Sequence, residues 1–389
     1  MDTLSSRGCE VFFVLVKFEG LCYLFADNMN KLANTWLPLL LTFWLLLVAC
    51  PKSPSSSLNH VPTVTVSTFV DSYDDSKGNT VQFKQPRGMT IDKAGNLYVA
   101  DTDNNRICKV TPEGKISILA GSTYKKNNES FADGPGSDAL FAGPSDIAID
   151  AKGNLYVADY FNNRIRKVTP KGEVSTFAGN GEHGMADGQG STAEIPWPSG
   201  VALDAKGNLY VADGYNRIRK VTPKGEVSTL AGSNEENNEG FADGKGSAAL
   251  FHMPTNMVLD TAGNLYVVDS YNHRIRKVTP EGEVSTFAGS GEQGIADGKG
   301  IAAQFRVARG ITMDVAGNLY VIDNHHIRKV TPEGEVSLFA GGAAWNSWGY
   351  ADGPGSAALF YGPSDITIDA KGNLYVLETK GRIRKITLE

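Results

Sequence analysis

The chain has 389 residues, a formal net charge of −6 and an apolar share of 41%, with 43 glycines. The glycine content suits a fold with many turns, and the four cysteines offer no disulfide or metal framework. The acidic balance persists beyond the first 49 residues, which argues against binding to a nucleic-acid phosphate backbone.

An apolar run at 37–49 ends directly at Cys50. The run is too short for a comfortable membrane span, and the letters LVAC at 47–50 resemble a lipobox, where a signal peptidase cuts before a diacylated cysteine. We therefore expect residues 1–49 to be a signal peptide, with Met29 as the true start, and Cys50 to be lipidated. A signal anchor with an incidental cysteine is the alternative, and it too leaves the rest of the chain outside the cytoplasm.

Residues 50–62 are rich in serine and proline and read as a tether that holds a domain at 63–389 off the membrane. The expected location is a bacterial cell envelope, with the outer membrane favoured over the inner one. Contact with the membrane is expected only through the lipid.

Beyond the tether, the sequence is built from repeats. The core GNLYV begins at Gly95 and recurs five more times up to Gly372, at spacings of 54 to 58 residues. Each copy reads as four short strands, which in the second copy fall at 147–150, 154–159, 164–168 and 173–179. β-branched and aromatic residues fill these strands, and Gly, Pro, Asp or Asn separate them.

Two of the connections within each repeat are uniform turns of the types DAKGN and TPKGE. The other two vary: the DYFNNR-type link between strands two and three, and a long link between repeats that carries the motif ADGxG. In an antiparallel meander alternate connections emerge on opposite faces, so the two variable connections share one face. We call it the loop face and expect binding there.

The two ends of the chain predict how the repeats are closed. The last repeat stops at 384–389 without a fourth strand, and a matching strand stands at 65–70, before the first repeat. The fold class that follows is an all-β, six-bladed β-propeller of four antiparallel strands per blade, closed by the N-terminal strand completing the last blade. An open stack of six units is the alternative, which leaves this match unexplained.

The motifs GNLYVAD, NNRIRKV, GEVSTFAG and ADGxGxAxxF resemble NHL repeats of the bacterial type over residues 62–389. The resemblance implies a six-bladed propeller. Propellers of this family serve as platforms that bind proteins, peptides, RNA or ligands, and a few branches are enzymes.

Most charged residues of the repeat are expected to be structural. The arginines of RIRKV lie on the same strand of every blade, which spreads them around the ring rather than gathering them into a nucleic-acid patch. Asp101 and its equivalents end the second strand, where an aspartate more often accepts backbone N–H bonds than binds a cation. The aspartates of the ADG motif are expected to be turn formers. No histidine spacing matches a zinc site.

The position just before the innermost strand breaks the repeat. It carries Arg87, Asp146, Asn256, Arg309 and Asp365, which should line the mouth of the central channel on the loop face. They are candidates for a ligand- or partner-binding site, and a self-satisfied salt-bridge network that plugs the channel is the alternative.

Aromatic residues also break the repeat on the loop face, where they mark a protein or sugar surface or cover the blade interfaces. Trp345 and Trp348, in the insertion GGAAWNSWGY, are the preferred exposed anchors. The others are Tyr124, Tyr160, Phe161, Trp197, Tyr215, Tyr271 and Tyr361.

The function expected from these features is a non-enzymatic module, without a cofactor and monomeric, that binds a protein, peptide or glycan of the cell envelope. No nucleophile–base set recurs with a plausible elbow. The enzymatic alternative is a Ca²⁺-dependent lactonase, or another hydrolase or lyase, at the channel mouth. Asp146, Asn256 and Asp365 would then be the weak candidate metal ligands, although no inward glutamate accompanies them.

Overall fold

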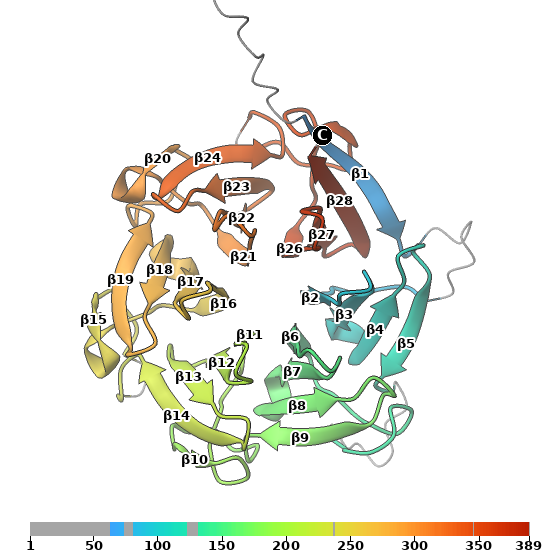
Figure 1. Cartoon of the computed structure of the whole chain (residues 1–389), viewed down its shortest axis with the longest axis vertical. Helices are drawn as coiled ribbons and strands as arrows, with labels where there is room; N and C mark the ends of the chain where they lie inside the picture. The colour runs from blue at the N-terminus through green and yellow to red at the C-terminus, as the bar shows by residue number, and fades with distance from the viewer. Residues whose placement is uncertain (1–62, 74–80, 123–130, 236–237, 345, 389) are drawn as a thin grey trace, which may run out of the picture. The chain divides into compact units, whose positions relative to one another are not determined.

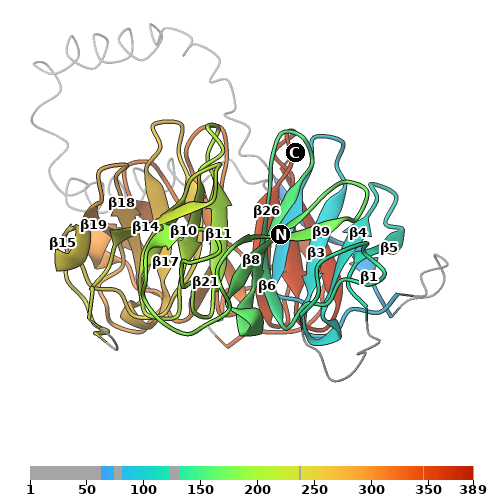
Figure 2. The same ribbon diagram turned by 90° about the horizontal axis from the view of Figure 1, so that it is seen from below.

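The computed structural model describes residues 63–73, 81–122, 131–235, 238–344 and 346–388, which form a ring of six β-sheets (Figure 1). The predicted signal peptide, Cys50 and the tether lie outside these residues. The connections gather at the two ends of the strands, as expected for a meander (Figure 2). None of the helices in this described part is long and apolar enough to cross a membrane.

Each sheet is one blade, and its four main strands run outward in chain order. The innermost strands are β2 (Gly88–Ile91), β6 (Pro144–Ile149), β11 (Gly200–Leu203), β16 (Pro254–Leu259), β21 (Ala308–Met313) and β26 (Pro363–Ile368). The second strands are β3 (Leu97–Asp101), β7 (Leu155–Asp159), β12 (Leu209–Ala212), β17 (Leu265–Asp269), β22 (Leu319–Asp323) and β27 (Leu374–Glu378).

The outer half of each blade follows the same order. The third strands are β4 (Arg106–Val110), β8 (Arg164–Val168), β13 (Ile218–Val221), β18 (Arg274–Val278), β23 (His326–Val330) and β28 (Arg382–Leu388). The fourth strands are β5 (Ile116–Ala120), β9 (Val174–Ala178), β14 (Glu226–Ala231), β19 (Glu283–Ala288), β24 (Glu335–Ala340) and, for blade six, β1 (Val64–Asp71).

Closure by the N-terminal strand is confirmed. β1 pairs antiparallel with β28, from Val64 opposite Leu388 to Asp71 opposite Arg382. Asp71 also forms an ion pair of 2.7 Å with the Nε of Arg382. The last blade is therefore assembled from both ends of the described chain, which closes the ring.

A feature absent from the sequence-based prediction is a fifth, two-residue strand on the outside of four blades. It comes from the ADGxG motif of the preceding link and comprises β10 (Gly188–Gln189), β15 (Gly244–Lys245), β20 (Gly298–Lys299) and β25 (Gly353–Pro354). In blade two an isolated bridge between Gly134 and Val174 takes its place. Five short 3-10 helices complete the elements: η2 (Thr102–Asn104), η3 (Tyr160–Asn162), η4 (Gly246–Ala248), η5 (Ser270–Asn272) and η6 (Gly300–Ala302).

The uniform DAKGN turn owes its recurrence to its own hydrogen bonds. In blade two the Oδ1 of Asp150 accepts from the backbone N–H of Lys152 at 2.9 Å and of Asn154 at 2.8 Å, and Gly153 takes a φ of 82°. Asparagine-like turns of this kind need a short acceptor at the first position and a residue that tolerates positive φ.

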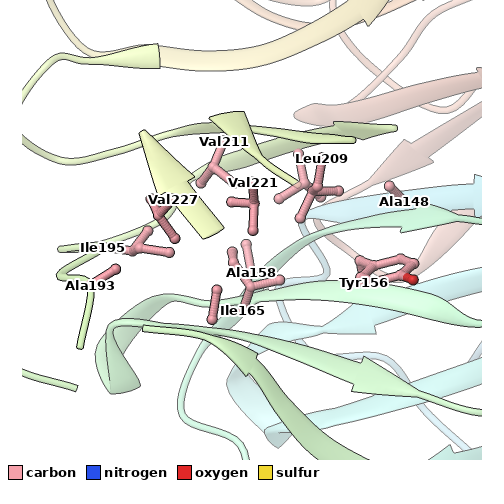
Figure 3. Close-up of a cluster of buried hydrophobic side chains, with 12 residues drawn as sticks. Ala148, Tyr156, Ala158, Ile165, Ala193, Ile195, Leu209, Val211, Val221 and Val227 are labelled. Atoms are coloured by element: carbon pink, nitrogen blue, oxygen red, sulfur yellow. The ribbon is translucent and has the colours of Figure 1, made fainter. Parts of the chain in front are cut away.

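The core lies between neighbouring blades rather than within one layer. The second strands are buried along their whole length, as Leu155–Asp159 illustrates, because both faces of each sheet are covered. Figure 3 shows one such cluster, in which Ala158 and Ile165 of blade two meet Leu209, Val211 and Val221 of blade three. Every blade therefore depends on its neighbours for burial, which makes the ring one cooperative unit.

Candidate functional site

The arginines in the middle of the third strands are structural. Arg166 is fully buried, and its guanidinium contacts Asp159 at 2.8 Å and Asp133 at 2.6 Å. It also donates to the carbonyls of Leu140 and Ala132. Arg219, Arg276, Arg328 and Arg384 are buried in the same way in blades three to six. The basic residues of RIRKV therefore do not form a nucleic-acid surface.

The strand-end carboxylates have the predicted structural role. The Oδ1 of Asp159 accepts the backbone N–H of Ala142 at 2.8 Å, while its Oδ2 binds Arg166. Burial raises the pKa of this carboxyl against the opposing effect of the Arg166 charge. The ring of aspartates is thus occupied by loop N–H groups and arginines.

The aspartates of the ADG motif correct the sequence-based prediction, which made them turn formers only. Asp133 binds the buried guanidinium of Arg166 and accepts the backbone N–H of Thr176 at 3.0 Å. Asp187, Asp243, Asp297 and Asp352 make the same ion pair in blades three to six. The long link is therefore fastened to the next blade through this pair.

Blade one is the exception, and it held the sequence signal for this pairing. No ADG motif precedes it, and Cys108 stands where the other blades have the buried arginine. Its strand-end carboxylate, Asp101, is instead bound by Arg106 at 2.7 Å. The simultaneous loss of the arginine and of the ADG aspartate in one repeat indicates that the two act together.

Three of the predicted site residues alternate around the inner strands. Asp146, Asn256 and Asp365 belong to blades two, four and six, while blades one, three and five have Gly88, Gly200 and Gly310 at this position. A Cβ on Gly88 would lie 2.5 Å from the Cα of Asp146, and one on Gly310 would lie 2.9 Å from the Cα of Asp365. The glycines thus allow the neighbouring backbone to approach. All three polar residues border a cavity of about 250 Å³ that touches every inner strand.

The carboxylates in this ring are buried and bonded to the backbone. Asp146 accepts from Val201 of the next blade at 2.8 Å, and Asp365 accepts from Met89 at 2.6 Å. The Nδ2 of Asn256 donates to Asp365 at 3.2 Å. Burial raises the pKa of Asp146 to about 7. Burial, together with the Asp146 charge, raises that of Asp365 well above its ordinary value.

The expected salt-bridge plug is not formed. Asp146 and Asp365 bind backbone N–H groups, and Arg87 and Arg309 are exposed, with no ion pair among the described residues. The ring also does not fit Ca²⁺, because the amide N–H of Asn256 points at Asp365 and the carboxyls are most stable protonated. In the described ranges no group of three or more His, Cys, Asp or Glu residues is arranged to hold a metal.

A second cavity, of about 290 Å³, lies beside the channel mouth on the loop face. Residues of blades two, three and four line it: Tyr160, Trp197, Ser199, Asp213, Gly214, Met253, Pro254 and Thr255. The Trp197 ring lies 4.5 Å from His183 and 5.9 Å from Tyr215, measured between ring centroids. Phe161 and Tyr271, from the η3 and η5 connections of blades two and four, are 68% and 63% exposed. We call this cavity the Trp197 pocket.

Two bulky residues of this pocket have an unusual backbone conformation. Trp197 has a φ of 43° and Met253 a φ of 53°, at a position that is Gly143 in blade two and Gly362 in blade six. Both are held by asparagines of the preceding blade, because Asn163 accepts from the N–H of Trp197 and Asn216 from that of Met253. Such residues are rare at positive φ and concentrate at functional sites.

Sequence reasoning named Trp197 among the aromatic residues but did not select it, and it missed Met253. The signal was available in the alignment of the repeats, where a position with glycine in two blades carries tryptophan and methionine in two others.

The preferred aromatic anchors are only partly placed. Trp348 is 58% exposed, and its ring lies 5.4 Å from that of Tyr361, which also stacks at 5.2 Å on Tyr350. Trp345 and Tyr124 lie outside the described residues. Trp348 therefore belongs to a second aromatic cluster over blade six.

Sequence profiles of known families match two parts of the chain. The profile of the Teneurin NHL domain matches residues 66–169, and that of the NHL repeat matches residues 251–278. Together with the recurring motifs and the six-bladed ring, these matches identify the chain as an NHL-repeat β-propeller.

Two curated relatives extend the comparison. The chain is 29% identical over 275 residues to Protein SUPPRESSOR OF QUENCHING 1, chloroplastic, of Arabidopsis thaliana, which covers 67% of the chain and 26% of the relative. It is 31% identical over 349 residues to NHL repeat-containing protein 2 of Bos taurus, covering 78% of the chain and 46% of the relative. The chain thus spans less than half the length of either relative.

Among solved structures, an auxiliary nutrient binding protein from Bacteroides ovatus superposes with a TM-score of 0.60 at 18% identity, covering 84% of this chain and 77% of the other. A streptogramin B lyase gives 0.53 at 16% identity, covering 84% and 98%. A gluconolactonase from Xanthomonas campestris gives 0.54 at 13%, covering 84% and 95%. At these identities the similarity shows a shared fold that occurs in binding proteins and enzymes alike.

Proposed function

We propose that this propeller is a ligand-binding module of a bacterial cell envelope and that it binds a protein, peptide or glycan at the Trp197 pocket. A binding role agrees with the nutrient-binding name of the Bacteroides neighbour, although enzymes share the fold. The argument rests on this chain's own residues.

The observation that carries the proposal is the backbone of Trp197 and Met253. Glycine serves this position without strain in two other blades, so stability alone does not require bulky side chains there. Both residues nevertheless border the same cavity. Strain of about 1–3 kcal/mol per residue, retained where two side chains converge on a pocket, is typical of a binding site.

The test is a Trp197→Gly variant. It introduces the residue that blades two and six already have at this position, so we expect the propeller to fold with little change in stability. Loss of the Trp197 ring should remove most binding, because a buried aromatic anchor commonly contributes 2 kcal/mol or more, about a 30-fold change in affinity.

The measurement is retention of envelope saccharides, peptides and proteins on the immobilised full chain, compared by mass spectrometry. Lys206→Ala, in an exposed turn of the opposite face, is the matched control and should retain what the wild type retains. Equal retention by Trp197→Gly and the wild type would remove the pocket from the proposal.

We further propose that Cys50 is lipidated and anchors the propeller, which agrees with the LVAC sequence at 47–50. The expected result is that the protein sediments with membranes and that a Cys50→Ser variant does not become acylated. Mass spectrometry of the N-terminal peptide measures this directly. An unmodified, uncleaved N-terminus in the wild type would instead favour a signal anchor.

A further inference from the structure

The six segments that lead into the innermost strands form the rim of the channel mouth. They are residues 84–88, 142–146, 196–200, 252–256, 306–310 and 361–365. Four cationic side chains belong to them, namely Lys84 and Arg87 in blade one and Arg306 and Arg309 in blade five. Their two carboxylates, Asp146 and Asp365, are buried. The rim is therefore cationic at its surface in a chain whose net charge is −6.

Arg87 and Arg309 occupy a position that is otherwise used to join the blades. In blades two, three and six, Ser145, Ser199 and Ser364 stand there and donate to a carbonyl of the next blade at 2.8 to 2.9 Å. In blade one Thr102 makes the corresponding bond to Pro144 at 2.8 Å. The exposed Arg87 is thereby relieved of this structural task.

Arg309 borders the Trp197 pocket directly. Thr255 lines the pocket, and its hydroxyl lies 3.3 Å from the carbonyl oxygen of Arg309, to which it donates. Arg309 also contributes, with His326 and Arg306, to the lowered pKa of His325, whose burial is the larger cause. Positive charge is thus concentrated next to the aromatic wall of the pocket.

The polar groups of the pocket are mostly engaged within the protein. The Ser199 hydroxyl contacts the carbonyls of Ala212 at 3.2 Å and Pro254 at 2.9 Å, and Asp213 binds Arg217 and Arg219. A saccharide ring needs several hydroxyl partners, whereas an apolar side chain needs none. The wall formed by Trp197, Met253 and Pro254 therefore suits an apolar group.

We propose that the Trp197 pocket and Arg309 together bind a carboxylate with an adjacent apolar side chain, as found at the C-terminus of a peptide that ends in an apolar residue. The apolar side chain enters the pocket, and the guanidinium of Arg309 pairs with the carboxylate. This inference deepens the proposed function and rests on it.

The probe is the tripeptide acetyl-Gly-Gly-Leu, compared with its C-terminal amide by calorimetric titration of the full chain. The acid should bind about five- to tenfold more tightly than the amide, since only the acid forms the charged pair. Arg309→Ala should weaken binding of the acid to the level of the amide and leave the amide unaffected. Trp197→Gly should weaken both, and Lys206→Ala neither.

Three outcomes would overturn the inference. The acid and the amide could bind equally, or Arg309→Ala could preserve their difference. Glucuronate could bind where the tripeptide acid does not, which would assign the cationic rim to an acidic saccharide. If no probe binds but Trp197→Gly still loses its envelope ligand, the carboxylate inference fails and the proposed function stands. Failure of both experiments would remove both.

Discussion

Arg276→Ala should lower the free energy of unfolding by about 3–5 kcal/mol, the range found when one partner of a buried ion pair is removed. Arg276 is fully buried and contacts Asp269 and Asp243, each at 2.7 Å. Without it, the Asp269 carboxylate would remain in the interior with its main counter-charge gone. The link that carries Asp243 would also lose its attachment to blade four. Chemical denaturation of the full chain measures the loss.

Two further variants separate the ion pair from general effects of mutation in this strand. Lys277→Ala changes the neighbouring, partly exposed residue and should cost less than about 1 kcal/mol. Arg276→Met combined with Asp269→Asn leaves no unpaired charge in the interior and should recover a substantial part of the loss. A loss below about 1 kcal/mol for Arg276→Ala would contradict the structural role assigned to these arginines.

The second large effect is a pH-dependent stabilisation by Asp146→Asn. Asn256 already occupies the equivalent position in blade four, so an amide is compatible with this ring. The folded pKa of Asp146 is about 7, against an ordinary value of 3.8, so the folded protein retains a proton that the unfolded chain loses. Stability from this carboxyl is therefore fully present below about pH 4 and is lost as the pH rises through about 7.

The variant escapes this loss. Its stability relative to the wild type should increase by about 2–3 kcal/mol between pH 5 and pH 8, the amount that the shifted pKa implies. Denaturation curves at the two pH values measure the change, with the exposed Asp103→Asn as control. A pH-independent difference would show that Asp146 is charged throughout. If the wild type also contained a stoichiometric Ca²⁺ that Asp146→Asn lost, the lactonase-type alternative would regain support.

The fold could be predicted from the sequence because the repeat states each strand six times. The recurrence of GNLYV located the second strands, and the unmatched strand at 65–70 identified the closing element. The two-residue outer strands could not be predicted, since Gly188–Gln189 and its equivalents have no β-branched or aromatic residues. Their position depends on a link that is fastened through Asp187 and Arg219.

The site was predicted less well because breaks in a repeat do not reveal burial. Asp146 and Arg309 both interrupt the pattern, yet one is buried against backbone N–H groups and the other is exposed. Charge alone could not separate these cases. The position of Trp197 was recoverable, because the glycines of two other blades imply a left-handed backbone there. The convergence of Trp197 with Tyr160 and Met253 required the three-dimensional arrangement of blades two to four.

The most direct test of the loop-face binding role is oxidative footprinting of the full chain with and without an envelope extract. Met253 is 44% exposed, and it borders the same cavity as Trp197. Methionine and tryptophan both react readily with oxidants, so each reports coverage of the pocket. We predict protection of Met253 and Trp197, while residues of the opposite face such as Val315 keep their reactivity. Protection confined to that opposite face, or unchanged oxidation of the pocket, would contradict the account.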